Sequence, residues 1–179
     1  MIYEFCAENV TLLEKAMQAG ARRIELCDNL AVGGTTPSYG VTKAAVELAS
    51  DYDTTIMTMI RPRGGDFVYN DLEIAIMLED IRVTAQAGSQ GVVFGALTAD
   101  KKLDKSNLEK LIAASKGMEI VFHMAFDELS DEDQLEAIDW LSQAGVTRIL
   151  TRAGVSGDSL EKRFAHYRRI LEHAAGKIE

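Results

Sequence analysis

Cysteine is scarce in this chain of 179 residues, which contains only Cys6 and Cys27. Two cysteines do not make the disulfide framework that stabilises small secreted domains. The amino terminus lacks the pattern of a signal peptide, and no apolar run approaches the roughly 20 residues of a membrane-spanning helix. A cytoplasmic protein with reduced thiols and no membrane contact is the simplest interpretation of these absences.

Basic residues are also in deficit, with 19 Lys and Arg against 28 Asp and Glu, so the net charge is -9. Such a charge repels phosphate backbones and anionic lipid surfaces, which argues against nucleic-acid and membrane partners. No Gly-x-Ser-x-Gly, Cys-x-x-Cys or P-loop pattern occurs, so no reaction type is indicated. Hydrophobic residues make up 47% of the chain, which suits one globular domain with a real core.

A repeated motif organises the chain. Three segments combine a helix end, Gln-Ala-Gly and a short apolar run: QAGARRIEL, QAGSQGVVF and QAGVTRILT. Glycine just past a helix supplies the left-handed cap, and the apolar run that follows is typical of a buried parallel strand. Six strands are predicted on such grounds: Ile2–Ala7, Arg23–Cys27, Thr54–Arg61, Gly91–Leu97, Glu119–Phe126 and Arg148–Arg152.

Helical segments lie between these strands. Thr11 with Glu14, and Asn70 with Glu73, have capping-box spacing, and Asp158 is expected to cap the last helix. Six alternations of strand and helix indicate an α/β fold with a parallel sheet. The first turn, CAENVT, lacks the glycine-rich loop of an open doubly wound sheet, and the units have similar lengths. A TIM-type (β/α) barrel is therefore favoured.

Six units are too few to close such a barrel, because eight units need about 250 residues. The last residues, GKIE, have the pattern of a helix cap followed by the start of a seventh strand. We therefore expect residues 1–179 to form a single (β/α)-barrel domain that lacks the last two strands, and the natural protein to be longer. Without those strands, the exposed edges are expected to aggregate or to pair with another copy as a homo-oligomer.

Two neighbouring strands carry the same Glu-x-Cys pattern, in EFC and ELC. Because strand side chains alternate between faces, Glu4, Cys6, Glu25 and Cys27 are predicted to face the barrel lumen. Neighbouring strands lie about 4.8 Å apart. Two thiols and two carboxylates are thus expected to cluster near the C-terminal mouth, where barrel active sites lie. Free cysteines are also common as plain core residues, and this alternative stays open.

The segment TMIRPRGGDF places two arginines beside a proline and a glycine pair. Arg61 is expected to end the third strand at the mouth, within reach of Glu4 or Glu25, because buried carboxylates need a partner. This group is then either a structural ion pair or a ligand site. Arg63 and the backbone of Gly64 and Gly65 are expected to line the rim and hold an anion.

His123 and Asp127 are four residues apart, with Ala125 between them, and are predicted to share one face of the fifth strand. This pair suits general acid–base catalysis, although a structural histidine–carboxylate pair has the same pattern. His166 and His173 are expected on a solvated face of the last helix, without a functional role.

Four segments together resemble the CutC family of copper homeostasis proteins: IELCDNLAVGGTTPSYG, MIRPRGGDFVY, GVVFGALT and VFHMAFDE. The resemblance covers the whole chain in order. It implies a (β/α) barrel and copper binding through cysteines, for which Cys6 and Cys27 match those of the family's first two strands. Two departures are Met124, where many members have arginine, and the absence of the family's seventh and eighth strands.

Two functions follow as hypotheses. The first is a cytoplasmic protein that binds Cu(I) through Cys6 and Cys27 for buffering or trafficking, since thiolates suit this soft ion. Met57 or Met59 would be an additional thioether ligand, although methionine inside a barrel is more often core filler. The alternative is an enzyme that acts on a small anionic or sugar-like metabolite through Glu, Arg and His at the mouth.

Overall fold

Six parallel strands alternate with helices in the computed structural model, which describes residues 2–154 and 157–179. The strands lie in chain order across one sheet: β1 (Glu4–Glu8), β2 (Arg23–Cys27), β3 (Thr55–Met59), β4 (Gly91–Phe94), β5 (Glu119–Phe122) and β6 (Arg148–Ile149). The α-helices are α1 (Leu13–Gln18), α2 (Tyr39–Ala49), α3 (Asp71–Gln86), α4 (Lys105–Ala114), α5 (Asp131–Gln143) and α6 (Leu160–Ala174), and two 3-10 helices are η1 (Leu30–Val32) and η2 (Met124–Glu128).

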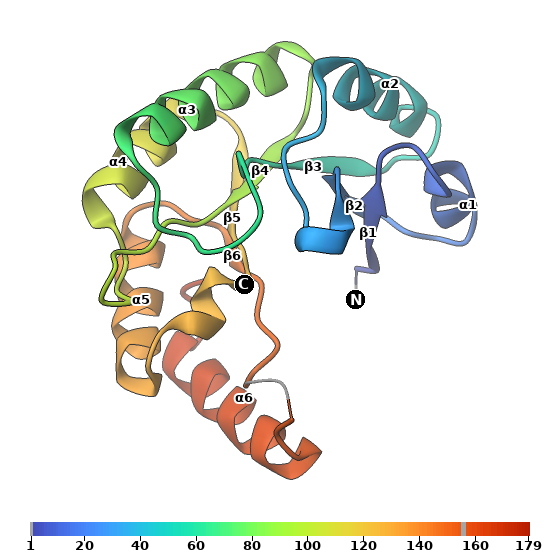
Figure 1. Cartoon of the computed structure of the whole chain (residues 1–179). Coiled ribbons are helices and arrows are strands. Elements are labelled where there is room, and N and C mark those ends of the chain that lie inside the picture. The colour runs from blue at the N-terminus through green and yellow to red at the C-terminus, as the bar shows by residue number, and fades with distance from the viewer. Residues whose placement is uncertain (1, 155–156) are drawn as a thin grey trace.

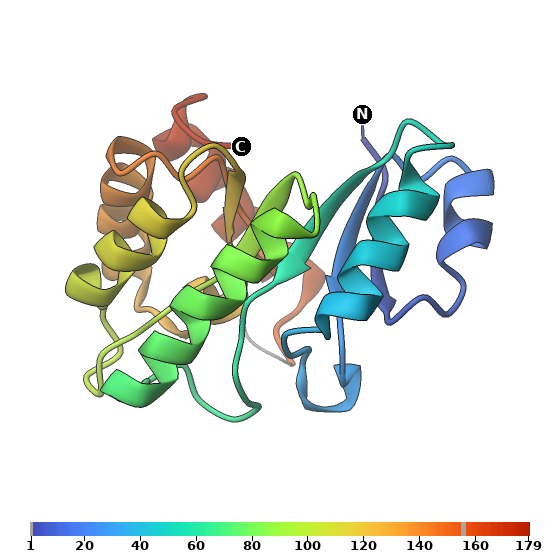
Figure 2. The ribbon, with the colours of Figure 1, turned by 90° about the horizontal axis from the view of Figure 1, so that it is seen from above.

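The sheet curls, with its helices on the outside, into half of a barrel (Figure 1), which the view from above also shows (Figure 2). This confirms the predicted parallel α/β architecture with barrel geometry. None of the helices within the described residues is long and apolar enough to cross a lipid bilayer.

The two faces of the sheet are packed differently. The outer face, under the helices, carries large buried residues such as Ile24, Ile56 and Phe122, which belong to two apolar clusters. The inner face carries a smaller cluster: Cys27, Met57, Met59, Val93 and Val121. Alternation along each strand therefore sends one set of side chains to the helices and the other into the lumen, as the pattern predicted.

Most strands end earlier than predicted. The clearest case is β5, which stops at Phe122 instead of reaching Phe126. The His123 side chain accepts a hydrogen bond from the backbone N–H of Ala125 and starts the 3-10 helix η2. A side chain that caps a turn gives the backbone an alternative to the strand ladder. The prediction that Asp127 continues this strand is therefore wrong.

The N-caps of the helices match the sequence predictions only in part. Asn70 and Glu73 form the predicted capping box at α3. The predicted box at α1 is wrong, because Leu12 is its N-cap and Glu14 instead accepts a hydrogen bond from the Tyr52 hydroxyl. At α6 the cap is Ser159, one residue after the predicted Asp158.

The last residues run beside β6. The N–H of Ile149 donates to the Glu179 carbonyl at 2.9 Å, and the N–H of Glu179 donates to the Thr147 carbonyl at 3.1 Å. Glu179 thus bonds to two positions two residues apart, which is the pattern of a parallel pair and fits the strand start predicted for GKIE, although these residues form no regular strand. On the opposite side of the sheet, Tyr3 and Phe5 of the β1 segment are exposed by 68% and 36%. Both side chains lie beside α1 residues such as Lys15 and Ala16, but that short helix leaves them largely uncovered.

Candidate functional site

Cys6, Glu25 and Cys27 form one cluster on the inner face of β1 and β2. Cys6 pairs with Glu25 in the strand register, and Cys27 lies two residues further along β2. The sulfur atoms of Cys6 and Cys27 lie 3.6 and 3.7 Å from the same carboxylate oxygen of Glu25, Oε1. One ligand atom from each of the three residues lies within 4.8 Å of the others. The expected meeting of the two thiols with a carboxylate is confirmed in this geometry.

The two thiols differ in access. Cys6 is exposed, whereas Cys27 is completely buried, so the cluster opens to solvent on one side only. The pKa of Cys27 is raised by its hydrogen bond with the Cys6 thiol, by burial and by the charge of Glu25. Burial also raises the pKa of Glu25, and the negative charge of Glu4 adds to this effect. Hydrogen bonds from the two thiols to Glu25 oppose this rise, so burial is what favours the neutral carboxyl, and it also favours the neutral Cys27 thiol.

Neighbouring residues close the buried side of the cluster. A Cβ atom at Gly34 would lie 3.0 Å from the sulfur of Cys27, and the φ of Gly34 is 88°, so the loop after η1 can cover this thiol only with glycine. Met57 belongs to the same inner-face cluster as Cys27. Its sulfur accepts a contact from the Arg148 guanidinium at 3.8 Å.

Glu4 does not join the cluster directly. It is the first residue of β1, at the amino end of the sheet, where it forms an ion pair of 3.3 Å with Arg23. Arg23 and Arg148, the first residues of β2 and β6, both lie within ion-pair distance of the Glu179 carboxylate. Glu179 therefore links these two strands at their amino ends. The predicted placement of Glu4 at the mouth is wrong, because a residue that starts a strand lies at the opposite end from its carboxyl terminus.

Arg61 lies at the mouth, as predicted, but it contacts neither Glu4 nor Glu25. Its guanidinium donates to the carbonyls of Val32, Gly34 and Gly65 at 2.7 to 3.0 Å. Arg61 therefore ties the loop after β2 to the loop after β3. The expected ion pair fails because nearby backbone carbonyls satisfy the guanidinium first.

The rim residues are engaged with their own loop. The Arg63 guanidinium is paired with the carboxylates of Asp66 and Glu73. Gly64 approaches Val32 so closely that an added Cβ would lie 2.7 Å away. The Gly65 carbonyl accepts from Arg61, so this pair of glycines also serves close packing between loops, and the expected role of their N–H groups in holding an anion stays a prediction.

His123 and Asp127 occupy separate surroundings. His123 is buried, its ring packs 4.7 Å from that of Phe67, and burial together with the positive charge of Arg61 lowers its pKa to about 3. Asp127 accepts from the Thr151 hydroxyl at 2.5 Å and from the Arg152 N–H at 3.0 Å. Within the part of the chain that the structure describes, no contact joins the two side chains, because η2 turns Asp127 away from the position it would have in a strand.

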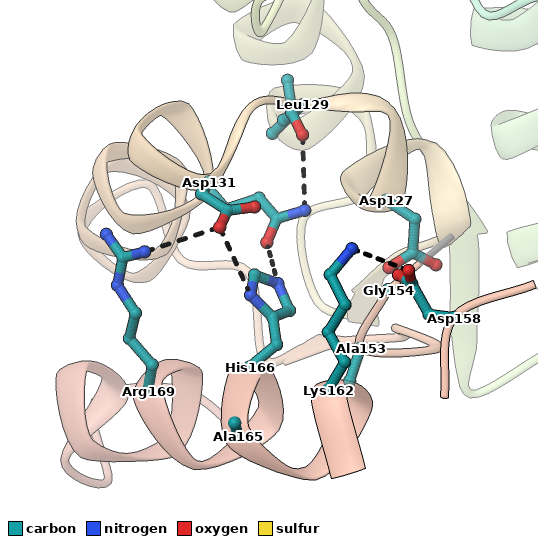
Figure 3. Close-up of a pocket in the computed structure, with 11 residues that line it drawn as sticks. Asp127, Leu129, Asp131, Ala153, Gly154, Asp158, Lys162, Ala165, His166 and Arg169 are labelled. Carbon is teal, nitrogen blue, oxygen red and sulfur yellow. Dashed lines mark hydrogen bonds and ion pairs between the residues drawn. The ribbon is translucent and has the colours of Figure 1, made fainter. Parts of the chain in front are cut away.

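A cleft of about 400 Å³ lies between η2, α5 and α6 (Figure 3). His166 of α6 hydrogen bonds to the Gln134 side-chain oxygen at 2.8 Å and faces Asp131, to which Arg169 is also paired at 3.5 Å. His173 contacts Asp139 at 2.9 Å. Both histidines were expected on a solvated face, but their side chains are only partly exposed and hold α6 against α5.

Comparison with known proteins gives a consistent result. The CutC family model matches residues 1–179. A CutC family protein of Enterococcus faecalis is 51% identical over 99% of this chain and 85% of its own length. The human copper homeostasis protein cutC homolog is 40% identical over 99% of this chain and 62% of its own length.

Solved structures agree with this result. The CutC crystal structure from Streptococcus agalactiae has a TM-score of 0.96 and 45% identity, and it covers all of this chain and 85% of that one. Deoxyribose phosphate aldolase from Aeropyrum pernix, with a TM-score of 0.68 and 13% identity over 98% of this chain and 71% of that one, shares the barrel fold alone. The chain belongs to the CutC family.

Proposed function

We propose that this protein binds Cu(I) as cargo through the thiolates of Cys6 and Cys27 and buffers or delivers it in the cytoplasm. The observation that carries the proposal is the convergence of both sulfur atoms on one carboxylate oxygen, at 3.6 and 3.7 Å. Thiolates are the ligands that Cu(I) prefers. The human relative is named as a copper homeostasis protein, which supports the same conclusion.

The unequal burial of the two thiols suits transfer of an ion. Exposed Cys6 is accessible to a copper donor or acceptor, whereas buried Cys27 holds its sulfur in a fixed surrounding. The apolar residues Met59, Val93 and Val121 share the inner face with Cys27 and provide few competing hard ligands. This combination favours a soft monovalent ion over Mg²⁺ or Ca²⁺, which require several oxygen ligands.

Glu25 has a second role in this proposal. Both thiols must lose a proton to become ligands. The raised pKa of Glu25 makes this carboxylate an acceptor for the proton of buried Cys27, with which it is already in hydrogen-bond contact, while exposed Cys6 releases its proton to solvent. A protonated Glu25 then donates to a thiolate and avoids a further negative charge beside the bound ion. Copper binding is therefore expected to weaken as pH falls.

The test is a titration with a competing Cu(I)-selective chelator under reducing, anaerobic conditions. Wild type is expected to take up one Cu(I) per chain, and Cys6→Ser/Cys27→Ser is expected to bind none. Met57→Leu is the matched control, because its sulfur already contacts Arg148, and it is expected to bind as wild type does. Equal binding by wild type and the double cysteine variant, with circular dichroism showing both folded, would remove the proposal.

A further inference from the structure

A second cluster of polar groups lies beside the copper site and has no part in the proposal above. Arg61, Tyr69 and His123 come from three segments and are exposed by only 4%, 7% and 4%. The Arg61 guanidinium lies 4.9 Å over the ring of Phe67, and that ring packs 4.7 Å from the ring of His123. Burial raises the pKa of Tyr69 to about 12, and the nearby Arg61 guanidinium opposes this rise.

Each of these residues has one buried polar atom without a hydrogen-bond partner among the described residues. These atoms are Arg61 Nε, the Tyr69 hydroxyl and His123 Nε2. His123 Nδ1 accepts from the Ala125 N–H, which in the neutral ring places the proton on Nε2. All three atoms can therefore donate a hydrogen bond. Buried donors without acceptors are rare, so three of them on residues close to one another call for an acceptor.

Arg61 is the charged member of this group, and it has no carboxylate partner. No ion pair among the described residues includes Arg61, whose other hydrogen bonds go to neutral carbonyls. The nearest loop acid, Asp66, is paired with Arg63. A buried cation surrounded by neutral groups strongly favours a counter-charge.

We propose that Arg61, Tyr69 and His123 bind a small oxyanion of the carboxylate or phosphate class at the mouth of the half-barrel. Single donors from three segments match an anion with several oxygen atoms better than a halide. Phe67 is partly exposed, packs against Arg61 and His123, and lines a cavity of about 470 Å³ together with residues such as Gly65, Leu97 and Lys101. The anion reaches the donors from this cavity when the Phe67 ring moves aside.

This site is distinct from the thiol cluster but shares one residue with it. The Gly34 carbonyl accepts from Arg61 at 3.0 Å. The same residue packs on the other cluster, because a Cβ atom added at Gly34 would lie 3.0 Å from the Cys27 sulfur. An anion bound to Arg61 would thus stiffen the loop that covers Cys27. The anion site does not depend on copper binding, because none of its donors is a sulfur ligand.

The experiment measures thermal unfolding of the full chain with sodium acetate or sodium phosphate, each compared with sodium chloride at equal ionic strength. A ligand of the native state raises the melting temperature with a saturable concentration dependence. Tyr69→Phe removes only the hydroxyl and is expected to weaken the apparent affinity roughly tenfold, the effect of losing one hydrogen bond to an anion. Tyr3→Phe, which removes an exposed hydroxyl, is the matched control and is expected to match wild type.

The outcomes separate the alternatives. A saturable shift with acetate alone identifies a carboxylate ligand, and one with phosphate alone identifies a phosphate ligand. A shift that is equal in wild type, Tyr69→Phe and Arg61→Lys reflects exclusion of salt from the surface and overturns the proposal. No shift beyond that of chloride also overturns it. The Cys6→Ser/Cys27→Ser variant is expected to keep the anion effect, so failure of the copper proposal and failure of this one are distinguishable.

Discussion

Helices α3 and α6 are similar in length, at 16 and 15 residues, but they are attached to the molecule in different ways. α3 buries Ile74, Met77, Ile81 and Thr84 against the sheet and its neighbours. α6 buries only Ile170 and Ala174. Its apolar stripe is exposed on the described surface and consists of Leu160, Phe164, Tyr167 and Leu171.

Polar contacts replace apolar burial at α6. His166 meets Gln134 and Asp131, and His173 and Lys177 both meet Asp139. Such contacts depend on pH and salt, whereas apolar burial does not. Two helices of similar length can therefore differ in how firmly they are held, because α3 faces the sheet with apolar side chains and α6 faces α5 with polar ones.

The largest expected effect comes from a matched pair of substitutions in these helices. Ile81→Ala in α3 removes a completely buried side chain and is expected to lower the free energy of unfolding by about 2–5 kcal/mol. Leu171→Ala in α6 removes a side chain that is 52% exposed, and about 0.5 kcal/mol or less is expected. Urea unfolding of both variants measures this. Equal losses would show that α6 is packed as firmly as α3.

The three histidines sharpen the comparison through pH. The folded-state pKa of His123, about 3, lies below its ordinary value of 6.5, so the unfolded chain takes up the proton first. Stability from this group is complete above pH 6.5 and falls as pH drops toward 3, by up to about 1.4 kcal/mol per pH unit. His166 and His173 differ from His123 in surroundings, because each is partly exposed and lies beside a carboxylate of α5.

The measurement is the slope of unfolding free energy between pH 7 and pH 5. His123→Asn keeps an acceptor for the Ala125 N–H but does not titrate, and its slope is expected to be shallower than that of wild type. The slopes are compared, rather than absolute stabilities, because the variant also changes packing. Identical slopes would contradict the assignment of a buried neutral His123.

Gln134 tests the polar attachment of α6 directly. Its amide donates to the carbonyls of Phe126 and Leu129, and its oxygen accepts from His166. Gln134→Ala is expected to cost about 1–3 kcal/mol, because buried carbonyls and an imidazole lose their partner. Hydrogen exchange should show faster exchange in α6 with α3 unchanged. Uniform acceleration in both helices would mean that α6 is part of one cooperative unit with the sheet.

Much of this fold was predictable because apolar strand runs followed glycine caps at regular spacing. The bounds of β2 match the prediction, and the Glu-x-Cys repeat placed Cys6 next to Glu25, since parallel strands keep period-two alternation in register. These features are local or depend only on neighbouring strands. They do not require knowledge of how loops pack.

The mouth was less predictable, because its geometry depends on loop backbone. The carbonyls that bind Arg61 have no sequence signature, and the turn at His123 depends on a hydrogen bond to Ala125. Glu4 was misplaced for a different reason. Its face was right, but its height along the strand depends on where β1 begins. Tyr69, which is near Arg61 in space, carried no signal in the sequence.

The smallest expected effect compares the caps of the same two helices. Asn70 closes a full capping box at α3, whereas Ser159 supplies a single bond to the Lys162 N–H at α6. Replacing either cap with alanine is expected to cost about 1 kcal/mol in its own helix. Because α3 is packed on the sheet, Asn70→Ala should lower the global unfolding free energy by most of that amount. Ser159→Ala should mainly fray the first turn of α6, which amide exchange detects while the urea midpoint stays close to wild type. A full shift of the midpoint in Ser159→Ala would show that α6 unfolds together with the barrel.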